Sequence, residues 1–126
     1  MNDTQVTIDI PGIDEATALS ICGRNIGIYI STLRLYVNNI TLALEKIRNV
    51  TEEDLDNYTA RVHGIKGISE YIGAREIRKK AKNLERLAKT GDIGLVREQN
   101  GDFVRQVEEM LHAIRNWLEK KETKTP

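Results

Sequence analysis

The sequence contains a single cysteine, Cys22, among its 126 residues. One cysteine cannot form an internal disulfide, which fits a reducing compartment, and we interpret it as a small hydrophobic residue near a helix end. No apolar stretch approaches the roughly 18 residues of a membrane span, because Arg34 interrupts the best candidate, residues 26–37. The first residues also lack the basic segment and apolar run of a signal peptide. These absences predict a cytoplasmic protein that does not associate with a membrane.

A net charge is also missing, because 19 basic side chains offset 19 acidic ones. This balance gives no support to a protein that binds nucleic acid mainly by electrostatics. The charges are nevertheless uneven along the chain, since residues 75–89 carry seven bases against two acids. This basic segment could steer an acidic partner, or it could be a solvated helix with internal ion pairs such as Glu85–Lys89.

The sequence has no phosphate-binding glycine loop, no nucleotide-binding glycine pattern and no aspartate-rich metal site. We therefore expect a protein that holds no cofactor or metal and cannot use ATP itself. Its hydrophobic content of 40% and charged content of 30% are ordinary for a globular protein and argue against disorder. At this length the chain fits one domain, residues 1–126, with an ordered part over about 8–120 and a frayed tail at 121–126.

Helical periodicity is present almost throughout the chain. Apolar residues recur at intervals of three and four in four long segments, which cover residues 26–47, 55–72, 74–88 and 93–117. The fourth pattern keeps its phase through Asn100-Gly101, which predicts one continuous helix there. The core is expected to include three large residues of this helix, Phe103, Met110 and Trp117.

Glycine, asparagine and aspartate mark the boundaries between these helices. The residues that can end or cap a helix are Gly23, Asn25, Gly73, Gly91 and Asp92. A shorter helix is expected to begin near Asp14, with residues 6–10 lying across one end of the fold. The whole pattern predicts an all-α fold, an antiparallel four-helix bundle with a short additional N-terminal helix.

The segment His63-Gly64-Ile65-Lys66-Gly67 carries the strongest indication of function. Because positions i, i+3 and i+4 share one face of a helix, His63, Lys66 and Gly67 should project together. Imidazole can act as a covalent nucleophile and is substantially neutral near pH 7, while a lysine can hold a phosphate as a mobile charge. Gly67 lowers helix stability by about 1 kcal/mol relative to alanine, which is understandable if a large partner must approach His63. The segment therefore predicts a phosphoryl acceptor site offered to another protein.

Residues 63–74 resemble the active helix of histidine-containing phosphotransfer (HPt) domains, whose pattern is His-x-x-Lys-Gly followed by an apolar-Gly-Ala turn. In this sequence the turn is Ile72-Gly73-Ala74. Residues 10–14, Ile-Pro-Gly-Ile-Asp, are similar to the lead into the family's first helix. Leu84-Glu85 with Gly91-Asp92 is similar to the end of its fourth helix. The resemblance therefore covers residues 8–120, nearly the whole chain.

The resemblance implies that His63 accepts a phosphoryl group from an aspartyl phosphate on a receiver domain and passes it to another receiver. Lys66 would screen the phosphoryl charge, and Gly67 would leave room for the receiver. The family commonly sets a polar side chain against the other ring nitrogen. By position this is Glu85, which could accept the Nδ1 proton and direct Nε2 outward. A solvent-exposed helix glutamate is the alternative interpretation of Glu85.

The partners expected from the resemblance are response-regulator receiver domains, a hybrid sensor histidine kinase, or both, with Mg²⁺ held by the receiver. The chain itself would be a monomeric phosphocarrier without ATP-dependent kinase activity. Three alternatives remain: a docking module that binds receivers but never carries phosphate, a basic-helix nucleic-acid binder, and a histidine-based hydrolase. The other histidine, His112, has no Lys-Gly after it and is interpreted as a surface residue.

Overall fold

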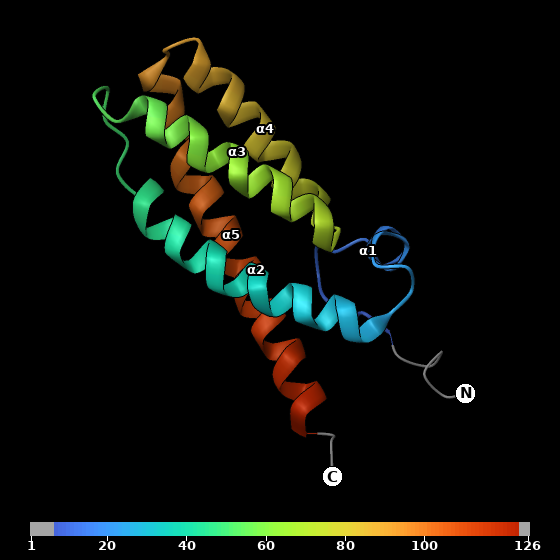
Figure 1. Cartoon of the computed structure of the whole chain (residues 1–126). Coiled ribbons are helices and arrows are strands. Elements are labelled where there is room, and N and C mark those ends of the chain that lie inside the picture. Colours follow the sequence, from blue (N-terminus) through green and yellow to red (C-terminus); the bar gives the residue numbers. More distant parts are fainter. Residues whose placement is uncertain (1–6, 124–126) are drawn as a thin grey trace.

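The computed structural model describes residues 7–123 and contains five helices in that range. They are α1 (Glu15–Ile21), α2 (Ile26–Ile47), α3 (Leu55–Ile72), α4 (Arg75–Lys89) and α5 (Ile93–Thr123). The four long helices run antiparallel in sequence order, and α1 lies at the end of the bundle where α3 ends and α2 begins (Figure 1). No strand occurs within the described part of the chain. The predicted fold, an all-α four-helix bundle with a short additional helix, is confirmed.

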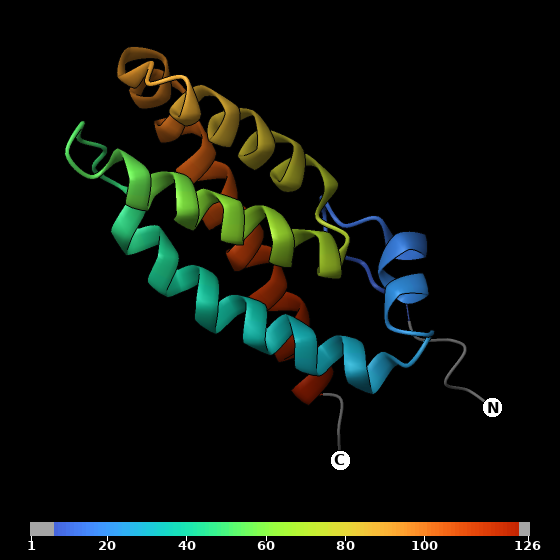
Figure 2. The ribbon, with the colours of Figure 1, turned by 45° about the horizontal axis from the view of Figure 1, so that its top comes forward.

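The centre of one side of the bundle is occupied by α3, which lies between α2 and α4 while α5 passes behind it (Figure 2). Each long helix buries one apolar face, as its periodicity requires. The last helix, α5, continues through Asn100 and Gly101 without a break, as predicted. The core also contains the three large α5 residues that the pattern placed there, Phe103, Met110 and Trp117.

Buried hydroxyl groups fix the positions of α2 and α5 against α3. The Tyr29 hydroxyl donates to the Ile72 carbonyl at 2.9 Å, and Tyr36 shares a hydrogen bond of 2.9 Å with the Ser69 hydroxyl. The Tyr58 hydroxyl donates to the side chain of Asn100 at 2.8 Å. Burial raises the pKa of Tyr36 to about 12, so this hydroxyl keeps its proton under ordinary conditions. Since buried polar atoms need partners, these bonds favour one register of the helices.

The predicted helix boundaries agree with the structure. The side chain of Asn25 accepts the Ile28 amide at 3.0 Å, and Asp92 accepts the Leu95 amide at 3.1 Å. Gly73 ends α3 in the left-handed region with φ of 81°. A Cβ atom there would lie 2.9 Å from the carbonyl oxygen of Asp14, so only glycine fits without displacing the start of α1.

The two ends of the described chain differ in how they meet the bundle. Residues 6–10 are expected from the sequence to lie across one end of the fold. Of these, Ile8 and Ile10 are buried in the core, and Val6 lies outside the described residues. At the other end α5 extends to Thr123, so the helix enters the segment predicted to be a frayed tail. The rest of that segment, residues 124–126, lies outside the described residues. Across the described part of the chain, no helix combines the length and the apolar character that a membrane span needs.

Candidate functional site

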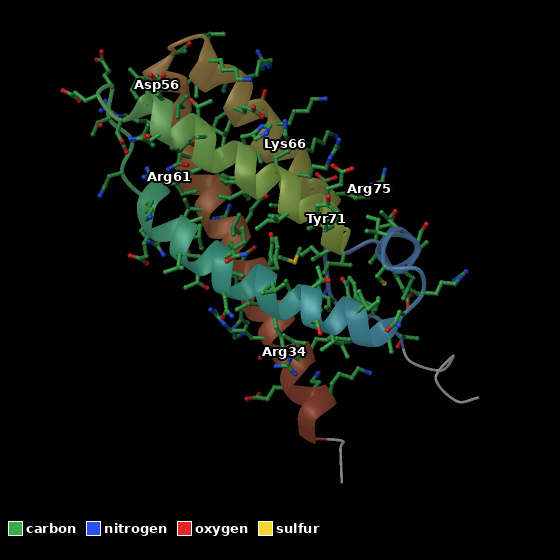
Figure 3. All side chains as sticks on the ribbon, viewed as in Figure 1. Arg34, Asp56, Arg61, Lys66, Tyr71 and Arg75 are labelled. Carbon is green, nitrogen blue, oxygen red and sulfur yellow. The ribbon has the colours of Figure 1, made fainter. Side chains whose placement is uncertain are left out.

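The candidate site lies on the outer side of α3. The buried stripe of this helix includes Val62 and Ile65, which face the core. His63 follows Val62 by one position and is therefore rotated away from the core, so that 64% of its side chain is exposed. Lys66, one turn later, is only 25% exposed and lies on the side of α3 that faces α4 (Figure 3). The structure thus presents an accessible imidazole with an ammonium group beside it.

Glu85 of α4 brings these side chains together. Its side chain is only 8% exposed, so the alternative of a solvent-exposed glutamate is wrong. The Oε2 atom lies 2.8 Å from Nδ1 of His63, and the Oε1 atom accepts a bond of 2.7 Å from Nζ of Lys66. The Nζ atom of Lys89 lies 3.2 Å from the same Oε2 atom. One carboxylate therefore contacts three basic groups from two helices.

The protonation of Glu85 follows from these contacts. The hydrogen bond from Lys66 has the largest effect and, with those from His63 and Lys89, outweighs burial, so the pKa of Glu85 falls from 4.5 to about 2. Near neutral pH the carboxylate is therefore ionised and can only accept hydrogen bonds. In a neutral imidazole the proton then belongs on Nδ1, and the lone pair of Nε2 points away from Glu85.

Two glycines of α3 leave the backbone beside His63 uncovered. A Cβ atom added at Gly64 or Gly67 would meet no atom within 4 Å. Packing inside the free protein therefore does not require glycine at either position, in contrast to Gly73. The open backbone lies one and four residues after His63, on the outer side of the helix.

The remaining sequence candidates lie elsewhere. His112 is exposed on α5, where its Nε2 atom lies 3.3 Å from the side-chain nitrogen of Asn116, as expected of a surface histidine. Cys22 is half-buried at the end of α1, and its thiol donates to the Leu19 carbonyl at 3.6 Å. Within the described residues, no three histidine, cysteine or acidic side chains gather into a possible metal site.

The basic helix α4 contains the intrahelical pair that its sequence allowed, while its steering of an acidic partner stays a prediction. Arg78 is paired with Glu70 of α3 at 3.2 Å, and Lys89 is paired with Glu85. Beside these pairs is a hollow of about 620 Å³, lined by Lys66, Lys79, Lys82, Asn83, Glu85, Arg86 and Lys89. Five of these seven residues are cationic, so the hollow next to the candidate site is strongly basic.

Lys89 is the site residue that the sequence analysis missed. The sequence indicates it only as part of the basic helix and as an intrahelical partner of Glu85. Its spacing of four residues from Glu85 was the available signal, because residues at i and i+4 are neighbours on a helix. Nothing local in the sequence indicated that the shared carboxylate would also contact α3.

Together the fold and the site define a class of protein, a helical bundle that offers one exposed histidine from its central helix. A family model described as Hpt domain matches residues 24–117, and the chain belongs to the Hpt domain family. Hpt domains are phosphocarrier modules of two-component signalling that interact with receiver domains and histidine kinases, and they are not kinases themselves. No curated protein and no solved structure matches this chain.

Proposed function

We propose that this protein is a phosphorelay intermediate in which His63 accepts a phosphoryl group from a receiver aspartyl phosphate and passes it to another receiver domain. The observation that supports this most directly is the 2.8 Å contact between Nδ1 of His63 and Glu85, on a ring that is largely exposed. This contact favours the ring proton on Nδ1, which would leave Nε2 available to a partner.

The transfer step uses the lone pair of Nε2. This nitrogen attacks phosphorus, the bond between phosphorus and the aspartate oxygen breaks, and the receiver carboxylate leaves as an anion. The ring keeps its Nδ1 proton and becomes positively charged, and the Glu85 anion stabilises that charge. In the return step the carboxylate of a second receiver attacks phosphorus, the phosphorus–nitrogen bond breaks, and the ring is neutral again.

The remaining residues of the site support this step from the side of the carrier. Lys66 supplies positive charge next to the phosphoryl group while it moves between two partners. Gly67 leaves the backbone open, so that the active-site loops of a receiver can come close to Nε2. The Mg²⁺ ion and the acidic cluster that binds it are supplied by the receiver.

We infer that a receiver docks on the face of the bundle that carries His63. Ile28, Leu35 and Leu42 of α2 are all exposed and are spaced seven residues apart, so they project from the same side of the helix, and we call this row the α2 stripe. The exposed Tyr71 of α3 adds a further large apolar side chain (Figure 3). Large exposed apolar side chains on one face can be covered by a protein partner. With the basic hollow of α4 on the other side of α3, a receiver would meet an apolar edge and a basic edge flanking His63.

The proposal is tested by mixing the pure protein with a phosphorylated receiver domain and mapping acid-labile, base-stable phosphate by mass spectrometry. We expect the label on His63 and none in the His63→Gln variant, which should still bind the receiver. A label on His112 would contradict the assignment. Receiver binding without any label would instead identify a docking module that carries no phosphate.

A further inference from the structure

The carboxylate of Glu85 has three partners, although one contact would be enough to orient the His63 ring. One acceptor oxygen is enough to hold the Nδ1 proton of His63. Glu85 is in addition bound by Lys66 through Oε1 and by Lys89 through Oε2, at 2.7 Å and 3.2 Å. While the ring is neutral, two ammonium groups and one carboxylate leave this cluster with one net positive charge.

Phosphorylation changes the charges that this cluster must balance. The ring becomes a cation that is hydrogen-bonded to Glu85. It therefore compensates part of the negative charge of Glu85 that the lysines compensate in the free protein. At the same time the phosphoryl group brings about two negative charges to Nε2. Lys66 lies one helical turn from His63 on a long flexible side chain, so its ammonium group can change partners without movement of the backbone.

Lys89 has a different relation to the carboxylate. It belongs to the same helix as Glu85, four residues later, and this pair does not depend on the position of α3. When Lys66 leaves, Lys89 still compensates the buried carboxylate and holds Oε2 against the ring. Without Lys89, Lys66 would be the only ammonium group on Glu85 and would be held there more firmly.

We propose that phosphorylation of His63 transfers Lys66 from Glu85 to the phosphoryl group, and that Lys89 is the positioning residue that keeps Glu85 in place during this exchange. The inference rests on the proposed function to the extent that His63 must be able to carry a phosphoryl group. Beyond that function, it makes Glu85 the partner of Lys66 in the unphosphorylated protein and gives Lys89 the role of positioning Glu85.

The exchange can be tested without a receiver, with phosphoramidate as the donor. In this reaction the nitrogen–phosphorus bond of the reagent breaks, the bond from Nε2 to phosphorus forms, and ammonia leaves. The rate is followed by mass spectrometry of the intact full chain. We expect Lys89→Gln to slow phosphorylation about two- to fivefold, the size expected for one solvent-exposed charge pair, and Lys89→Arg to restore the rate.

Two controls separate positioning from other effects of the charge. Lys80→Gln removes the same charge from the same helix, but Lys80 lies outside the basic hollow and is paired with Asp102 of α5 at 3.9 Å, so the rate should stay as in the wild type. In a Glu85→Gln background, Lys89→Gln should cause no further loss. Equal slowing by Lys80→Gln, a loss that persists in the Glu85→Gln background, or no slowing by Lys89→Gln would each overturn the role of Lys89.

The partner exchange itself is observed through the ¹⁵N signals of the lysine ammonium groups. Addition of phosphoramidate should shift the signal of Lys66 and leave that of Lys89 nearly unchanged, and neither should move in the His63→Gln variant. An unchanged Lys66 signal on phosphorylated protein would overturn the exchange. If phosphoramidate labels His63 but no receiver does, the relay proposal fails while the exchange is still measured.

Discussion

The Nδ1 atom of His63 lies 2.8 Å from the Oε2 atom of Glu85, although the two residues are 22 positions apart and belong to different helices. The ring is thus held by a nearly covered carboxylate that Lys66 and Lys89 also bind. Because a buried, multiply bonded group moves little, the contact fixes which ring nitrogen faces solvent. The rate of phosphoryl transfer should therefore depend on Glu85.

Substitution of Glu85 should affect transfer in a graded way. Glu85→Gln keeps an oxygen that can accept the Nδ1 proton but removes the charge, whereas Glu85→Ala removes both. We expect transfer from a phosphorylated receiver to slow by about tenfold or more in Glu85→Ala, and by less in Glu85→Gln. Rapid-quench single-turnover measurements check this. Glu76→Ala, on the exposed side of the same helix, is the matched control, and a Glu85→Ala rate equal to it would contradict an orienting role.

Glu85 should also make stability depend on pH in an acidic window. Its pKa is lowered from 4.5 to about 2 by the hydrogen bond from Lys66 and then by those from His63 and Lys89. A group whose pKa is lower in the folded state stabilises that state above its unfolded pKa, and this stabilisation disappears as the pH falls toward the folded value. The free energy of unfolding should therefore fall more steeply between pH 4.5 and 2 in the wild type than in Glu85→Gln. Urea unfolding at several pH values measures this, and parallel curves would contradict the assigned contacts.

The helices and the orientation of His63 were predictable because they follow from local rules. Apolar spacing gave the buried face of each helix, and a residue one position past Val62 must turn away from it. Glycine and asparagine gave boundaries such as Asn25 and Gly73, since both act through their own backbone or side chain.

The contacts between helices were not predictable from local rules. Asn100 occupied an apolar position of the fourth pattern, but nothing near it indicated that Tyr58 and the Ile47 carbonyl would be its partners. Likewise the position of Glu85 followed only from the family resemblance, which gave no measure of its burial. Both depend on how neighbouring helices are rotated about their axes, and that is decided by packing of the whole core.

The two uncovered glycines of α3 should lower the stability of the free protein, and Gly67 should also give a receiver access to His63. An added methyl group meets no atom at either Gly64 or Gly67, so alanine should stabilise the free protein by about 0.5–1 kcal/mol at each position. Gly67→Ala should nevertheless slow transfer from a receiver, because the methyl group lies on the face that the receiver approaches. Thermal unfolding and transfer rates are measured on the same samples.

Gly101→Ala supplies the control for this pair of measurements. It adds a methyl group to open space on α5, away from the site, and should stabilise the protein with no change in transfer. Gly67→Ala that transferred phosphate as fast as Gly101→Ala would show that glycine is not needed for access. Destabilisation by Gly67→Ala would show that the position is packed.

The α2 stripe should contribute to receiver binding and not to folding. Leu35 is 62% exposed, so Leu35→Ser should change the free energy of unfolding by less than about 0.5 kcal/mol. If a receiver covers this side chain, the same change removes buried apolar area from the complex and should weaken binding about fivefold or more, as measured by isothermal titration calorimetry. Leu95→Ser, at an exposed apolar position in the first turn of α5, should leave binding unchanged. If Leu35→Ser binds the receiver as tightly as Leu95→Ser does, the receiver does not cover the α2 stripe. It would then dock on the side of α3 that carries the basic hollow of α4.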